Sequence, residues 1–301
     1  MKIELEYSDR EALGKWNETI CGLRLKKPAV CGTISITAAS RRLNRHRGIF
    51  AMLLSTNGLI LREQNTGEDD RIITILTKER GVIRAFANKA RRIKSKNTSA
   101  TSLLSYSRLT LYFGRDKYTV NEAEPIEVFF HLREDLVLLS LAQYFCELCL
   151  NLAPKEEDAE ETLRFVLNTL SMLAREKRPP AFLKPVFELR LLSMAGYMPD
   201  LTMCEACGCY ETAEMQLLLR SGRLRCVACG PVAEPSARLP KGVLFAMRHI
   251  VYAEPEKLFS FSLPEKSLRI LSDACERYLL AQLDRGFPTL QFYHGLVDFA
   301  G

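Results

Sequence analysis

Apolar and polar residues follow two different periodic patterns along the chain, and the first pattern predicts β-strands. From residue 52 to about 128, short runs rich in β-branched and aromatic residues are separated by turn formers. The polar, alanine-containing stretch 97–104 predicts one short helix between the third and the fourth strand. We expect five strands, at residues 53–62, 71–77, 82–87, 109–113 and 118–123. Five strands with a helix in that position are typical of an OB-fold, a small β-barrel, which we expect at residues 52–130.

The second pattern begins after Pro125 and predicts helices. Apolar residues recur there at intervals of three and four, as in Leu268, Leu271, Cys275 and Leu279. We expect these helices to share one core, in a C-terminal helical domain at residues 131–301. The predicted helices cover residues 134–152, 160–176, 181–195, 241–251 and 265–284.

Four paired cysteines interrupt the helical pattern. Two residues lie within each pair and eighteen lie between the pairs, which suits a tetrahedral site of four sulfurs; the cysteines are Cys204, Cys207, Cys226 and Cys229. Gly208 and Gly230 follow the pairs and can adopt the backbone conformation that each metal-binding turn requires. Residues 215–220 and 222–225 predict a hairpin. We therefore expect a zinc ribbon at about residues 200–234, holding one structural Zn²⁺, because four thiolates leave no open position for catalysis.

Other assignments of the cysteines and of nearby ligand types stay open. The four cysteines could instead be free or joined in disulfides, although their paired spacing would then be coincidental. Cys209 could exchange with Cys207 as a ligand. His249 and His294 lie outside the paired frame, and we expect them to pack or to lie at the surface. The predicted fold class is thus α+β and multidomain, with an N-terminal OB-fold barrel and a C-terminal helical domain into which the ribbon is inserted.

Composition agrees with a globular protein inside the cell. The chain has 301 residues, 47% of them hydrophobic, and has neither an apolar run of eighteen residues nor a hydrophobic signal segment at its start. We expect a cytoplasmic protein, in which the ten cysteines are reduced or bind metal. Residues 1–51 form an N-terminal extension of uncertain structure. Its basic run at Arg41, Arg42, Arg45 and Arg47 is either a nucleic-acid-binding arm or a solvated linker.

Charge is unevenly distributed along the sequence. The formal net charge is +6, yet nine basic and no acidic residues lie between Arg80 and Arg115, and without these nine the chain has 33 basic against 36 acidic residues. Such a block creates a field that attracts polyanions. We therefore predict a nucleic-acid interface formed by Arg84, Phe86, Lys89, Arg91, Arg92, Lys94, Lys96, Arg108 and Arg115.

The residue types in this interface suit single strands. Side chains alternate along a strand, so Arg84 and Phe86 share one face of the strand 82–87. An OB-fold binds single strands by placing phosphates beside cations and stacking bases on aromatic rings. The loop that follows, residues 89–96, would contact phosphates with little dependence on sequence. The alternatives are that Phe86 belongs to the core and that the loop is merely solvated.

The motifs of several enzyme classes are missing from the sequence. There is no phosphate-binding Gly-x-x-x-x-Gly-Lys-Ser/Thr loop, no His-Glu-x-x-His and no Gly-x-Ser-x-Gly. The acids at residues 68–70 form a tight cluster at a turn, where we interpret them as solvated. We expect no catalysis, no small-molecule substrate and no membrane partner. An RNA-binding or translation-associated protein remains the alternative, because OB-folds and ribbons serve RNA equally well.

The order of these motifs resembles the RecO family of recombination mediators. Residues 187–200, followed closely by Cys204 and Cys207, are similar to that family's junction between helix and zinc site. The resemblance covers about residues 52–296, and residues 1–50 have no counterpart in it. The segments that resemble the family's N-terminal OB domain are 58–62, 67–71, 77–84 and 89–92.

The resemblance implies a protein of the nucleoid that binds single- and double-stranded DNA and anneals complementary strands. It implies action together with RecR and single-stranded-DNA-binding protein, and an indirect role in loading RecA. In this interpretation the basic block is the DNA surface, the ribbon is a rigid structural element, and the helical domain is a platform for protein partners.

Overall fold

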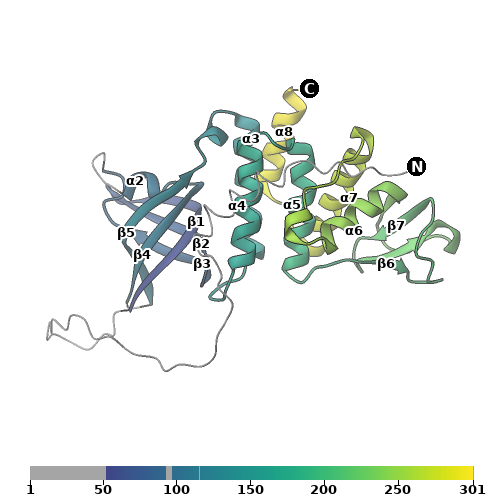
Figure 1. Cartoon of the computed structure of the whole chain (residues 1–301), viewed down its shortest axis with the longest axis horizontal. Coiled ribbons are helices and arrows are strands. Elements are labelled where there is room, and N and C mark those ends of the chain that lie inside the picture. Colours follow the sequence, from purple (N-terminus) through teal and green to yellow (C-terminus); the bar gives the residue numbers. More distant parts are fainter. Residues whose placement is uncertain (1–51, 93–96, 115, 301) are drawn as a thin grey trace. The chain divides into compact units, whose positions relative to one another are not determined.

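The computed structural model describes residues 52–92, 97–114 and 116–300, which belong to one compact unit (Figure 1). The predictions for residues 1–51 and for Lys94, Lys96 and Arg115 lie outside these residues.

Four antiparallel strand pairings and one parallel pairing close the first part of this unit into a barrel. The strands follow the order β1-β2-β3-β5-β4 around the barrel, and α2 (Asn97–Ala100) lies between β3 and β4 in the chain. The predicted OB-type barrel is therefore confirmed. The strands are β1 (Met52–Thr66), β2 (Asp70–Thr77), β3 (Gly81–Ala87), β4 (Ser105–Gly114) and β5 (Lys117–Val128).

The prediction for residues 97–108 is wrong in detail. The helix ends at Ala100 instead of residue 104, where Leu104 adopts a positive φ of 60°. Strand β4 then begins at Ser105, four residues earlier than predicted. Ser105 and Ser107 are buried, and their hydroxyls donate to the carbonyl oxygens of Ser99 and Ala100 at 2.7 and 2.8 Å. These hydrogen bonds allow polar side chains to occupy a buried stretch of strand.

Helices form most of the second half of the chain, and the five predicted ones are confirmed to within two residues at each end. Aromatic rings fill their shared core: the centroids of Phe145 and Phe187 lie 4.0 Å apart, and those of Phe165 and Phe187 lie 5.2 Å apart. Helix α8 (Pro288–Ala300) was not predicted, and it packs against α3. No helix in the described ranges is long and apolar enough to cross a membrane. The predicted helices are α3 (Leu136–Leu152), α4 (Glu160–Ala174), α5 (Pro180–Met194), α6 (Lys241–Tyr252) and α7 (Glu265–Leu283).

A second sheet of four strands carries the cysteines, in the order β6-β8-β7-β9. The predicted hairpin is present, because β7 and β8 pair antiparallel with Met215 opposite Cys226. Two flanking strands were not predicted: β6 pairs parallel with β8, and β9 pairs antiparallel with β7. The strands are β6 (Asp200–Cys204), β7 (Glu214–Leu218), β8 (Arg223–Cys226) and β9 (Ser236–Pro240).

The barrel and the helices meet at the turn between β2 and β3. The backbone amide of Val82 donates to the carbonyl of Pro154, and the amide of Ala159 donates to the carbonyl of Lys78, both at 2.8 Å. The barrel residues Leu59, Leu61, Leu76 and Tyr106 also belong to the core that the helices form. Backbone hydrogen bonds and a shared apolar core therefore join the barrel to the helices.

Candidate nucleic-acid interface and metal site

The outer face of β3 carries a cation and an aromatic ring side by side. Arg84 is exposed, and its guanidinium lies 3.4 Å from the side-chain oxygen of Gln64. Phe86 is half-buried and is not part of the barrel core, which takes Ile83, Ala85 and Ala87 from this strand. The Nζ of Lys117 lies 5.6 Å from the centroid of the Phe86 ring. A base that stacks on that face of the ring would therefore have to displace Lys117.

The basic loop after β3 is held by the acidic turn between β1 and β2. Its described cations, Lys89, Arg91 and Arg92, are all exposed. The turn contacts each of them: Asp70 accepts from the amide of Lys89 at 2.7 Å, the Glu68 carbonyl accepts from the guanidinium of Arg91 at 3.0 Å, and Asp69 pairs with Arg92 at 2.6 Å. The interpretation of these acids as solvated is therefore wrong for Asp69 and Asp70, while the Glu68 side chain is exposed and contributes only its carbonyl. Sequence position could not show which loop folds against the turn.

A buried arginine that the sequence analysis missed anchors the segment around α2, which comes after this loop in the chain. Arg71 is 9% exposed and pairs with Glu63 at 3.1 Å. Its Nη1 also donates to the hydroxyls of Thr101 and Ser102, at 3.3 and 3.4 Å, directly after α2. Arg71 occupies the inward phase of β2, in step with Ile73 and Ile75. The alternation along β2 could have identified Arg71 from the sequence, because a charged side chain at an inward-facing position needs partners.

Arg108 lies apart from the other predicted cations. It is on β4, opposite Asn57 of β1 and Glu124 of β5, and β4 does not pair with β3. Its guanidinium pairs with Glu124 at 3.0 Å, and Glu122 is also exposed on the same strand as Glu124. Arg108 is close to the other predicted cations in the sequence, but the order of the strands separates it from them in the barrel.

Strand register adds a second cation to the face that carries Arg84. Arg62 of β1 lies opposite Thr74 of β2, and Thr74 lies opposite Arg84 of β3. Both arginines are exposed. Only the pairing register reveals this row, because twenty-one residues separate the two arginines in the sequence.

The four paired cysteines meet as predicted, with ligand atoms that all lie within 4.8 Å of one another. Neighbouring sulfurs are 3.8 Å apart between Cys204 and Cys229, 3.6 Å between Cys207 and Cys226, and 3.4 Å between Cys226 and Cys229. A disulfide needs about 2.05 Å. Zinc–sulfur bonds of about 2.3 Å in a tetrahedron place the sulfurs about 3.8 Å apart. The four residues therefore fit one metal ion and do not fit disulfides.

Local backbone geometry prepares these sulfurs to bind metal. Gly208 and Gly230 have positive φ angles of 70° and 83°, as their positions after the cysteine pairs predicted. Desolvation opposes ionisation of Cys204, but hydrogen bonds from backbone amides, that of Cys226 first among them, outweigh it and lower the pKa of Cys204 to about 6. The thiolate is the form that binds metal, so these amides favour the binding state of Cys204, whereas hydrogen bonds among the sulfurs raise the pKa of Cys207 and Cys229.

The other candidate ligands are engaged elsewhere. Cys209 lies outside the group of four, and its sulfur is 3.3 Å from the carbonyl of Glu211. The Nε2 of His249 lies 2.8 Å from the carbonyl of Lys257, and the Nε2 of His294 lies 2.9 Å from a carboxylate oxygen of Glu276. Each has a protein partner within hydrogen-bond distance.

Arg248 of α6 ties the cysteine-bearing sheet to the helices. The side chain is buried, and it donates to the carbonyl oxygens of Leu201, Thr202 and Tyr210 at 2.7, 3.0 and 2.8 Å. Its guanidinium also lies 4.0 Å from the centroid of the Tyr210 ring. The loop that carries Cys204 and Cys207 is thus fixed from the helical side.

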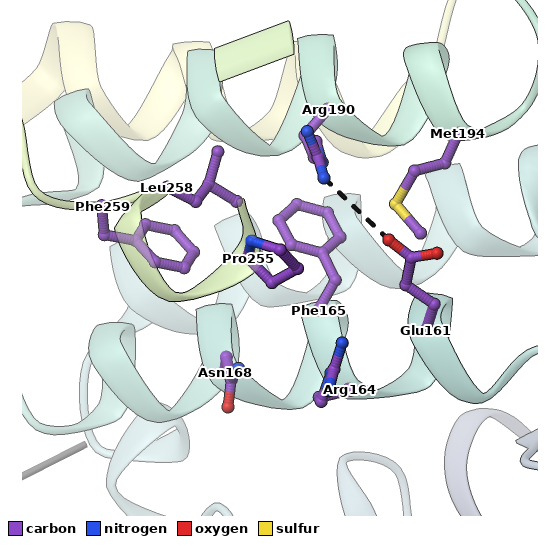
Figure 2. Close-up of a pocket in the computed structure, with 9 residues that line it drawn as sticks. All are labelled: Glu161, Arg164, Phe165, Asn168, Arg190, Met194, Pro255, Leu258 and Phe259. Carbon is purple, nitrogen blue, oxygen red and sulfur yellow. Dashed lines mark ion pairs between the residues drawn. The ribbon is translucent and has the colours of Figure 1, made fainter. Parts of the chain in front are cut away.

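A small pocket lies between α4, α5 and the segment after α6 (Figure 2). Phe165, Leu258 and Phe259 supply apolar lining, while Glu161 and Arg190 face each other at 4.0 Å. The Arg190 guanidinium also donates to the carbonyls at the end of α6, including that of Val251 at 2.9 Å. Arg190 is therefore committed to holding these elements together.

Comparison with known proteins identifies two matched regions. The family described as "Recombination protein O N terminal" matches residues 52–129, and "Recombination protein O C terminal" matches residues 133–291. The chain is 36% identical to the DNA repair protein RecO of Acetivibrio thermocellus over 239 residues, which are 79% of this chain and 95% of that protein. It is 31% identical to RecO of Symbiobacterium thermophilum, over 80% of this chain and 96% of that protein. It is 30% identical to RecO of Alkaliphilus metalliredigens, over 80% and 98%.

Proposed function

Because this chain belongs to the RecO family of DNA repair proteins, we propose that it is a recombination mediator that binds single- and double-stranded DNA and anneals complementary strands. It does so without breaking or forming covalent bonds in the DNA. The family assignment agrees with the resemblance seen in the sequence, and the boundary between the two matched regions, residues 129–133, supports a division into a barrel domain at 52–130 and a helical domain at 131–301.

One observation carries the DNA-binding part of this proposal: a closed barrel exposes Arg84, Lys89 and Arg91 on β3 and the loop that follows it, and the same strand carries the half-buried ring of Phe86. None of these three cations forms an ion pair with a carboxylate among the contacts of the described residues, so their charge is available to a ligand. Phosphate contacts of this kind provide affinity without sequence preference, and an aromatic ring adds stacking with any base.

The partners proposed for this chain follow from its family. We infer that it acts with RecR and single-stranded-DNA-binding protein, and that it thereby helps to load RecA on coated DNA. The helical domain is the platform for these proteins, and the cytoplasm with its nucleoid is the expected location.

Zinc is the metal that we propose for the four cysteines. Four thiolates in tetrahedral array are the ligand set of structural zinc, and they leave no coordination position for a reacting water. Cys204, Cys207, Cys226 and Cys229 would hold the ion, and its contribution would be to fold the ribbon rather than to react.

Strand annealing tests the proposal directly. Complementary oligonucleotides coated with single-stranded-DNA-binding protein should anneal faster with the purified chain than without it, in the absence of ATP and of free divalent metal. Excess single-stranded DNA of unrelated sequence should suppress this activity more than RNA of matched length. Failure to accelerate annealing, or stronger competition by RNA, would reject the DNA-repair activity in favour of an RNA-binding one.

A further inference from the structure

Two neighbouring carboxylates of the turn between β1 and β2 contact the basic loop in different ways. The Asp70 carboxylate accepts a hydrogen bond from the backbone amide of Lys89 at 2.7 Å, whereas the Asp69 carboxylate pairs with the side chain of Arg92 at 2.6 Å. Asp70 therefore positions the loop backbone. Asp69 instead neutralises one of the loop's cations.

The backbone of the loop is held firmly enough for this pairing to be a defined feature. Ala90 is fully buried in the barrel core. Its carbonyl accepts from the hydroxyl of Thr98 at 2.8 Å, and the amide of Arg91 donates to the carbonyl of Asp69 at 3.0 Å. Next to the ion pair between Asp69 and Arg92, the loop is thus held to the turn through the amide of Arg91 and to α2 through the carbonyl of Ala90.

The ion pair lies where a nucleic acid can reach it. The side chains of Arg92 and Asp69 are 55% and 39% exposed. A carboxylate oxygen and a phosphate oxygen accept the same charge-assisted hydrogen bonds from a guanidinium, so they compete for it. Arg91 differs in this respect, because its guanidinium donates to an uncharged carbonyl and keeps its net charge.

We propose that Asp69 is an internal competitor of the DNA phosphate, withholding Arg92 and keeping the affinity of the barrel below the value that its cations allow. This inference rests on the proposed DNA-binding function and adds to it a residue that limits affinity. An exposed ion pair is weak, so Asp69 tunes binding and does not block it.

A double-mutant cycle measures the competition. Asp69→Asn should bind single-stranded DNA about two- to fivefold more tightly, which is the range expected for an exposed ion pair. The logarithm of its affinity should also fall more steeply with the logarithm of salt concentration, by about 0.7 for one further phosphate contact. Arg92→Ala should weaken binding less than about twofold in the natural chain, but should abolish the whole gain in the Asp69→Asn background.

Asp70→Asn is the matched control, because it removes the same charge from the same turn while the amide oxygen can still accept from Lys89. Its gain in affinity should be smaller than that of Asp69→Asn. An equal gain, or an equal cost of Arg92→Ala in both backgrounds, would overturn the inference while leaving the proposed function intact. A natural chain that fails to bind single-stranded DNA would instead reject the proposed function itself.

Discussion

The arginines of the barrel differ in what they can offer a ligand, although the sequence presents them as equal charges. Arg71 is buried and donates to groups around α2. Arg92 and Arg108 each pair with a carboxylate, whereas Arg84 donates to the uncharged amide of Gln64. The charge that a ligand meets therefore depends on the partners of each residue, and counting basic residues between Arg80 and Arg115 overstates it.

Cys226 provides a test of the metal site at the scale of one residue. Replacing Cys226 with serine removes one of four thiolates, so the chain should lose its zinc, which elemental analysis of the purified protein would measure. Because metal binding to such sites contributes to folding, the midpoint of thermal unfolding should also fall, by roughly 2–4 °C for each kcal/mol of stability lost in a unit of this size.

Cys209→Ser is the control for this substitution. Cys209 is close in sequence but lies outside the group of four, and a serine hydroxyl can replace its contact with the Glu211 carbonyl. This variant should keep its zinc and its melting midpoint. Zinc retained by Cys226→Ser, or lost by Cys209→Ser, would contradict the assignment of ligands.

At the scale of elements, the turn between β2 and β3 makes a tight contact with the segment that joins two helices. Gly81 has a positive φ of 56°, and a Cβ placed on it would lie 2.1 Å from the carbonyl oxygen of Pro154. Gly67, in the turn between β1 and β2, has a nearly identical φ of 57° but nothing within 4 Å of such a Cβ. A side chain at Gly67 would therefore meet backbone strain alone, whereas a side chain at Gly81 would meet the same strain and also a clash with Pro154.

Alanine substitutions at these glycines should destabilise the chain to different extents. Gly67→Ala should cost about 1 kcal/mol, which is the penalty for a left-handed conformation. Gly81→Ala should cost about 3 kcal/mol, because overpacking against backbone adds to the same penalty. Chemical denaturation of both variants checks the difference. Equal costs would mean that the junction yields freely and that the contact with Pro154 is unimportant.

Periodicity predicted the elements well where side chains faced a core, and failed where polar groups were buried. The strand β3 and the helix α7 follow their apolar patterns to within one residue. The start of β4 was predicted too late, because Ser105 and Ser107 are polar and their burial depends on hydrogen bonds to carbonyls of α2, which no local pattern reveals. The helix α5 was predicted, but the burial of its Lys184 was not: the side chain is 2% exposed and pairs with Glu188, one turn along, at 2.9 Å and with Glu276, ninety-two residues away, at 2.7 Å.

The candidate sites were likewise predictable where the signal is local and not where it depends on distant parts of the chain. The four cysteines were predictable because ligand spacing within each pair is a local property, and the two pairs then had to share one ion. The interface was predictable only in part. Strand register decides that Arg62 joins Arg84, that Arg108 lies beside Glu124, and that the turn at residues 68–70 meets the basic loop.

For the whole molecule, the remaining question is whether the barrel face that carries Arg84, together with the basic loop, dominates attraction to DNA. A chain with +6 net charge could bind a polyanion through diffuse charge alone. In that case, removing any two exposed cations would have the same effect. A localised interface requires instead that the position of the cations matters more than their number.

Paired substitutions separate these two cases. Arg84→Ala with Arg91→Ala should weaken binding to single-stranded DNA and reduce the slope of log affinity against log salt by about 1.4, since each lost phosphate contact accounts for about 0.7. Lys266→Ala with Arg285→Ala removes the same charge from exposed positions at the two ends of α7, where Arg285, like Arg84, donates to an uncharged side-chain amide, and should leave that slope unchanged. Fluorescence anisotropy across a salt series measures both. Equal losses from the two double variants would show that net charge, and not the barrel face, drives binding, because only a local interface distinguishes two arginines of the barrel from two cations of a distant helix.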